Sequence, residues 1–162
     1  MSQIEPRELE KFILEDLKTR LQQDLRDHKI IREKDLECCV YYHLRQFLQK
    51  DPLWKVLVEK HSPRTRHYID LLVLHNVKPE IAIELKWKRT HISKKDYKSL
   101  SLGLSELKLK KAYFITTAVP SDSIYSKLIE TPMIQEIIVG LNLSPVDCMQ
   151  WKLERKKIKD VC

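Results

Sequence analysis

The chain has 162 residues, a formal net charge of +7 and a hydrophobic share of 43%. These values suit one globular domain, and no apolar run is long enough to predict a membrane-spanning helix. The basic balance favours a polyanionic partner. Only two glycines occur, Gly103 and Gly140, which excludes the glycine-rich phosphate loops of nucleotide-binding enzymes.

The start of the chain and its cysteines indicate where in the cell the protein is expected. Residues 1–8 hold no signal-peptide core, and the four cysteines do not follow a zinc-binding spacing. We therefore expect a cytoplasmic protein without a membrane attachment. Cys38 and Cys39 are adjacent, where a disulfide would be strained, so we expect both to be small packing residues on a helix.

Two amphipathic helices are predicted first. Apolar residues recur at three- and four-residue steps between Leu9 and Leu25, and Ser2 with Glu5 fits a capping box before them. A second helix is predicted from about Asp35 to Gln49, and Asp51-Pro52 ends it. The expected apolar positions are Leu9, Phe12, Ile13, Leu17, Leu21 and Leu25, then Leu36, Val40, Leu44, Phe47 and Leu48.

Three short strands are predicted next. Trp54, Val56 and Val58 alternate with other residues, which is the period of a strand with one buried face. Apolar runs follow at residues 68–74 and 81–87, and turn-forming residues precede each of them. Because the connections are short, we expect antiparallel neighbours.

The remaining elements predict an α/β protein. A helix over 93–107 is followed by a strand over 112–117, which implies a crossover connection and a mixed central sheet flanked by helices. Residues 123–128 and 133–139 predict short helices. Met149, Trp151 and Leu153 alternate, which predicts an edge strand near the end of the chain.

Three charged residues interrupt the two apolar runs. Asp70 lies in the first run, and Glu84 and Lys86 lie in the second. Glu84 and Lys86 are two residues apart, so they project to the same face of a strand. In a suitable hairpin register Asp70 would join them. Unpaired buried charges are costly, so something must compensate for the two carboxylates, and a divalent cation is the simplest candidate.

This trio suits hydrolysis of a phosphodiester bond. Two carboxylates can hold Mg²⁺ through hard oxygen ligands and leave positions for water and substrate. The metal lowers the pKa of a bound water, and a lysine can orient or deprotonate that water and neutralise phosphate charge. We therefore expect a Mg²⁺-dependent nuclease that also accepts Mn²⁺. A structural ion pair between Glu84 and Lys86 on an exposed face is the alternative.

The order of these residues resembles the PD-(D/E)xK nuclease superfamily, which includes restriction endonucleases and archaeal Holliday-junction resolvases. The match covers residues 33–118, with Glu37 on a helix, Asp70 in a strand and Glu84-Leu85-Lys86 on the next strand. The resemblance implies a restriction-endonuclease-like fold and a metal held by Asp70, Glu84 and the backbone carbonyl of Leu85. It also implies that Lys86 works on the attacking water and that Glu37 assists the metal directly or through water.

The sequence departs from the family at one position and leaves one residue open. Ile69 stands where the family has a proline before the Asp. Glu37 has a second interpretation, as a solvated residue that is stabilised by the positive end of its helix.

Basic residues flank the charged strands and predict phosphate contacts at the mouth of the site. A solvated loop is the alternative for them. A further basic run lies in the tail (152–159), where a solvated tail is the preferred interpretation. The predicted nucleic-acid-binding residues are Arg64, Arg66, Lys88, Arg89, Lys94 and Lys95.

We expect one nuclease domain over residues 1–162. Its parts are a helical extension at 1–28, a nuclease core at 33–118, and a region of helices and an edge strand at 119–162. The expected activity is endonuclease cleavage of nucleic acid, with DNA as the preferred substrate. Symmetric cutting of both strands would favour a homodimer. The alternatives are a non-catalytic nucleic-acid-binding module on the same fold and a structure-specific exonuclease or junction resolvase.

Overall fold

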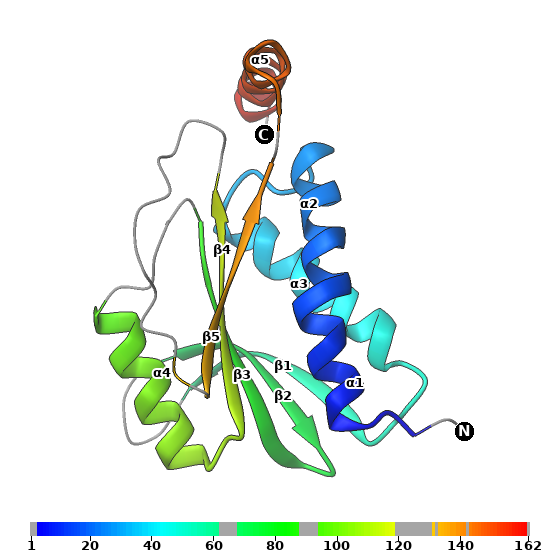
Figure 1. Cartoon of the computed structure of the whole chain (residues 1–162), viewed down its shortest axis with the longest axis vertical. Coiled ribbons are helices and arrows are strands. Elements are labelled where there is room, and N and C mark those ends of the chain that lie inside the picture. Colours follow the sequence, from blue (N-terminus) through cyan, green and yellow to red (C-terminus); the bar gives the residue numbers. More distant parts are fainter. Residues whose placement is uncertain are drawn as a thin grey trace.

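A five-stranded sheet lies between helices on both of its faces (Figure 1). The computed structural model describes residues 3–61, 68–87, 94–118, 131, 133–141 and 143–161, without the side chains at 60, 61, 95 and 161. The predicted α/β class, a mixed central sheet flanked by helices, is confirmed. The strands are β1 (Trp54–His61), β2 (Tyr68–His75), β3 (Lys78–Lys86), β4 (Lys111–Ala118) and β5 (Ile134–Gly140).

The strands follow one another across the sheet in chain order, from β1 to β5. β1, β2 and β3 form an antiparallel meander, whereas β4 runs parallel to β3 and β5 parallel to β4. Helix α4 (Lys94–Leu107) lies between β3 and β4 in the chain, as the crossover requires. A tight turn at Asn76 and Val77, both with positive φ, joins β2 to β3, as is usual for a two-residue hairpin turn.

The amino-terminal helices cover one face of the sheet. α1 (Pro6–Lys11), η1 (Phe12–Leu17) and α2 (Lys18–Arg26) form one long continuous helical segment, which lies beside α3 (Glu33–Leu48) in Figure 1. η1 is a single stretch of π-helix within that segment. α1 begins at Pro6, with Glu8 accepting the N–H of Glu5, rather than at the predicted Ser2, which lies outside the described residues.

Alternation along the central strands divides the core into two layers. Leu71 and Ile83 pack on the face that carries α1, η1, α2 and α3. Leu72 and Ala82 pack on the opposite face, where α4 contributes Leu100 and Leu104. The predicted apolar positions of the first two helices are all buried except Phe47, which is partly buried.

Two predictions for the last part of the chain were wrong. Residues 133–139, predicted to be a helix, lie mostly in β5, because parallel pairing with β4 satisfies their backbone groups and buries Ile137 and Val139. Residues 149–153, predicted to be an edge strand, lie in helix α5 (Pro145–Val161). Only Trp151 of the alternating trio is buried, and Ser144 caps the helix by accepting the N–H of Asp147.

The predicted helix at 123–128 lies outside the described residues. Among the helices that the structure describes, none combines the length and the apolar composition needed to cross a membrane.

Candidate active site

The β2–β3 hairpin brings Asp70, Glu84 and Lys86 together. Leu71 pairs with Ile83 across the hairpin, so Asp70 and Glu84 each stand one residue beyond this pair. The backbone N–H of Leu85 donates a 2.7 Å hydrogen bond to Oδ2 of Asp70. Nζ of Lys86 lies 3.0 Å from Oε1 of Glu84. The two carboxylates and the amine therefore meet at one end of the hairpin.

Both carboxylates are held in a poorly solvated environment. Burial raises the pKa of Asp70 to about 6, although the N–H of Leu85 and the charge of Lys86 oppose the shift. Burial raises the pKa of Glu84 to about 7, and the neighbouring charge of Asp70 adds to this effect. Each group is thus harder to ionise than an exposed carboxylate, and the charge of Asp70 further hinders ionisation of Glu84.

Lys86 stays a cation in this setting. Burial acts to lower its pKa, but the charges of Glu84, Asp70 and Glu33 outweigh burial and raise the pKa above its ordinary value. At neutral pH the ammonium group therefore balances part of the negative charge of the two carboxylates.

Glu37 lies near this group but is directed to another partner. Its Oε1 lies 2.7 Å from Nζ of Lys34, which also lies 3.0 Å from Oε1 of Glu59. The charge of Glu37 contributes to the raised pKa of Asp70, so the two carboxylates influence each other. Glu37 therefore lies within electrostatic range of Asp70, while its ion-pair partner among the described residues is Lys34.

Glu33 is a site residue that the sequence analysis missed. It opens α3, and its Oε2 accepts a 3.1 Å hydrogen bond from the N–H of Trp87, the residue after Lys86. Its charge helps to raise the pKa values of both Asp70 and Lys86. Glu33 stands four residues, or about one helical turn, before Glu37, and this spacing is the signal that could have identified it.

Most of the predicted phosphate-binding residues fall outside the described residues. Arg64, Arg66, Lys88 and Arg89 lie there, as does the side chain of Lys95. Lys94 is exposed at the first position of α4. Two positions later, the charge of Asp96 contributes to the raised pKa of Glu84, so α4 begins close to the site.

The donor set at the hairpin end fits a hard divalent cation. Asp70 and Glu84 offer carboxylate oxygens, which Mg²⁺ prefers, and Mg²⁺ commonly takes only one or two carboxylates and keeps several waters. Burial, which raises the pKa values of both groups, leaves their ionised forms poorly solvated, and a cation would stabilise those forms. Among the described residues, no three histidine, cysteine, aspartate or glutamate side chains form a ready-made metal cage.

Helix α5 is fastened to the same end of the sheet by Arg155. The guanidinium carbon lies 4.7 Å from the ring centroid of Trp87 and 5.2 Å from that of Trp151. Nη2 of Arg155 donates a 3.0 Å hydrogen bond to the carbonyl of Ile31, just before α3. One buried side chain thus joins α5, the start of α3 and the end of β3.

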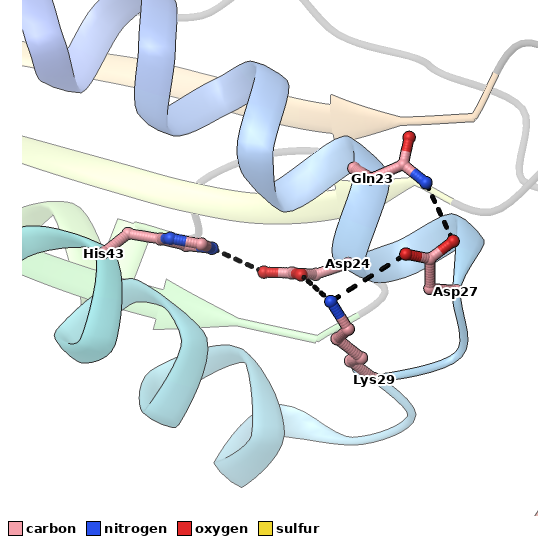
Figure 2. A network of polar contacts seen from close by, with 5 residues as sticks. All are labelled: Gln23, Asp24, Asp27, Lys29 and His43. Carbon is pink, nitrogen blue, oxygen red and sulfur yellow. Dashed lines mark hydrogen bonds and ion pairs between the residues drawn. The ribbon is translucent and has the colours of Figure 1, made fainter. Parts of the chain in front are cut away.

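A second polar cluster joins α2 to α3 (Figure 2). Oδ2 of Asp24 lies 2.6 Å from Nε2 of His43, and Oδ1 of Asp24 accepts a 3.0 Å hydrogen bond from Nζ of Lys29. A carboxylate accepts only, so Nε2 of His43 carries the proton. Although burial opposes it, the contacts with His43 and Lys29 hold the pKa of Asp24 below its ordinary value.

Nucleophilic chemistry does not suit this second cluster. Cys39 stands four residues before His43, but burial, with help from Asp24, raises the pKa of its thiol to about 12. The thiolate that would act as a nucleophile is therefore absent at neutral pH. Cys38 is exposed, which makes the prediction that both cysteines pack wrong for that residue. The cluster holds α2 against α3.

A scan against models of protein families and a search of curated proteins each found no match to this chain.

Proposed function

We propose that this protein is a metal-dependent endonuclease that hydrolyses phosphodiester bonds in nucleic acid, with DNA as the expected substrate. Membership of the PD-(D/E)xK superfamily is part of the proposal. The observation that carries it is the meeting of Asp70, Glu84 and Lys86 at the end of the β2–β3 hairpin, where the carboxylates are poorly solvated.

The two buried acids favour a bound cation. A single lysine cannot balance two ionised carboxylates, and burial, the main cause of their raised pKa values, makes the unbalanced charge costly. A fold under no functional demand would be more stable with apolar residues at these positions. Buried carboxylates at such a place are typical of a site that binds a ligand of opposite charge.

Asp70 and Glu84 would provide carboxylate oxygens to Mg²⁺ or Mn²⁺, and the carbonyl of Leu85 would complete the protein's ligands. A bound divalent cation supplies Lewis acidity, which activates water and stabilises phosphate charge. Asp70 is oriented for this role by the N–H of Leu85, which fixes one of its oxygens. Glu33 holds the backbone after Lys86 through the N–H of Trp87.

Lys86 would act on the phosphate and the attacking water as a cation. Its raised pKa keeps it protonated at neutral pH, which favours charge stabilisation and orientation of water over proton abstraction. Glu37 and Glu33 would add negative potential that attracts the metal toward Asp70, either through water or at a distance.

The test is cleavage of supercoiled plasmid with Mg²⁺, with Mn²⁺ and with EDTA. We expect nicked and linear products with either metal and none with EDTA. The Lys86→Ala variant should lose at least about 100-fold in rate, as expected for removal of a transition-state contact. Cleavage in EDTA, or an undiminished Lys86→Ala variant, would contradict the proposal. Metal-insensitive binding without cleavage would favour a non-catalytic module, and cutting confined to free ends or four-way junctions would favour an exonuclease or resolvase.

A further inference from the structure

Helix α5 carries charged residues on both sides of its buried face. Glu154, on one flank, lies 3.2 Å from Nε2 of His28 in the connection between α2 and α3. Trp151 and Arg155 form the buried face of the helix. Three exposed lysines, at helical spacings of four and three residues, lie on the other flank. They are Lys152, Lys156 and Lys159.

The contacts made around the axis of α5 show on which side of the helix the three lysines lie. A helix advances by about 100° per residue, so Glu154 lies on one side of Arg155, and all three lysines lie within about 100° of Arg155 on the other side. The partners follow the same order. Glu154 contacts His28, Trp151 donates to the carbonyl of Leu25, and Arg155 stacks on Trp87.

The lysine flank therefore begins on the side where α5 contacts Trp87. Trp87 directly follows Lys86, so this flank lies near the end of β3 that carries the candidate active site, while Trp87 itself packs beside Leu85 on the face covered by α1, η1, α2 and α3. Among the described residues, the ion pair of α5 joins Glu154 to His28, and none of the three lysines takes part in an ion pair. Their charges are not neutralised by an ion pair with any residue that the structure describes.

From this placement we infer that Lys152, Lys156 and Lys159 form a phosphate track, which binds the backbone of nucleic acid as it leaves the active site. The inference rests on the proposed function and names the surface that holds the substrate. The row covers about 10 Å along the helix, at about 1.5 Å per residue, which suits several phosphates of one strand. Arg155, in the same basic run, has a different role because it is buried against two tryptophans.

A binding measurement without catalysis tests this track. The probe is a fluorescein-labelled 30-base-pair DNA duplex, followed by fluorescence anisotropy in EDTA from 50 to 300 mM salt. The triple variant Lys152→Gln, Lys156→Gln, Lys159→Gln is compared with a matched triple variant, Lys50→Gln, Lys55→Gln, Lys78→Gln. The control lysines are also exposed. Lys55 and Lys78 lie near the β2–β3 turn, at the opposite end of the hairpin, and Lys50 lies just after α3.

We expect the α5 variant to bind more weakly and its slope of log K against log salt to fall by roughly 2 to 3, at about 0.9 per lost phosphate contact. The control should change by less than one unit. Equal binding by wild type and the α5 variant, or equal weakening of both triple variants, would overturn the track while leaving the plasmid-cleavage test of the endonuclease unaffected. A wild-type protein that binds no nucleic acid at any salt would overturn both. Circular dichroism melts of the three proteins establish that all are folded.

Discussion

The backbone N–H of Leu85 and the carboxylate of Asp70 join the two strands of the candidate site through a 2.7 Å hydrogen bond. Leu85 stands between Glu84 and Lys86, so this single bond fixes the acid of β2 relative to both charged residues of β3. It also satisfies the backbone N–H of Leu85, a buried residue that is only 1% exposed. The bond links the stability of the hairpin end to the geometry of the site.

Two substitutions of Asp70 separate these contributions. Asp70→Asn keeps an oxygen acceptor for the N–H of Leu85 and removes a costly buried charge, so the metal-free variant should melt at or above the wild-type temperature at pH 8. Asp70→Ala leaves that N–H unpaired, which should cost about 1–3 kcal/mol in the free energy of unfolding. Both variants should lose cleavage. Thermal melts in EDTA provide the measurement, and an alanine variant as stable as the asparagine variant would contradict this account.

Stability of the metal-free protein should fall as pH rises through the weakly acidic range. The pKa values of Asp70 and Glu84 are raised to about 6 and about 7, so between pH 4 and pH 7 the folded state binds more protons than the unfolded state. The free energy of unfolding then decreases with pH over that window and levels off above it. Melting temperatures from pH 5 to pH 8 in EDTA, compared with those of the Asp70→Asn, Glu84→Gln double variant, isolate the effect. If the melting temperatures of the two proteins changed with pH in the same way, this prediction would be wrong.

Divalent cations should stabilise the protein more at pH 8 than at pH 5.5, because protons compete for the same carboxylates. A concentration of 100 times the dissociation constant adds about 2.7 kcal/mol, which corresponds to a rise of several degrees in melting temperature. Thermal shift with MgCl₂ and MnCl₂ measures this, with CaCl₂ for comparison. If the rise persisted in Glu84→Gln, the cation would be binding elsewhere.

Arg155→Ala should destabilise the protein by about 2–4 kcal/mol, because two cation–π contacts and a hydrogen bond to Ile31 are lost together. Cleavage should fall several-fold as the end of β3 loosens beside Trp87. The neighbouring variant Lys157→Ala is the control, since Lys157 is exposed. Urea unfolding compares the three proteins, and equal stability of Arg155→Ala and Lys157→Ala would show that the contacts contribute nothing.

Strong periodic patterns allowed most of the fold to be predicted. The helices that carry Leu9 to Leu25 and Leu36 to Leu48 bury one face, and β2 and β3 are apolar runs separated by a tight turn. The meeting of Asp70 with Glu84 followed from the same pattern, because antiparallel pairing of short neighbours permits few registers. For these elements local sequence and tertiary packing agree.

The errors lie where local pattern and packing disagree. Ile134, Ile137 and Ile138 have helical spacing, but β4 offered an open edge for parallel pairing, which only the tertiary structure determines. Met149 and Leu153 alternate with Trp151 as in a strand, yet both are exposed on a helix. The Ser144-Pro145 helix start was a local signal for that helix that the alternation obscured.

Two contacts near the site could not be predicted by spacing within one segment. Glu33 reaches Trp87 across 54 residues of sequence, and Arg155 reaches Ile31 across 124. Each depends on how α3 and α5 are placed at the end of β3. A basic run such as 152–159 is typical of a solvated helix. Only the burial of Arg155 in the folded protein sets this residue apart from the exposed lysines around it.

The most direct test of the central claim compares two glutamates on the same strand. Glu84 and Glu80 both lie on β3, and each side chain is 12% exposed and paired with a lysine, Lys86 for one and Lys110 for the other. Their glutamine variants therefore make the same chemical change at two equally exposed side chains of one strand, and only Glu84 belongs to the candidate site. With Mg²⁺ and supercoiled plasmid, we predict that Glu84→Gln loses cleavage by at least about 100-fold while Glu80→Gln retains it. Equal cleavage by the two variants would contradict the account.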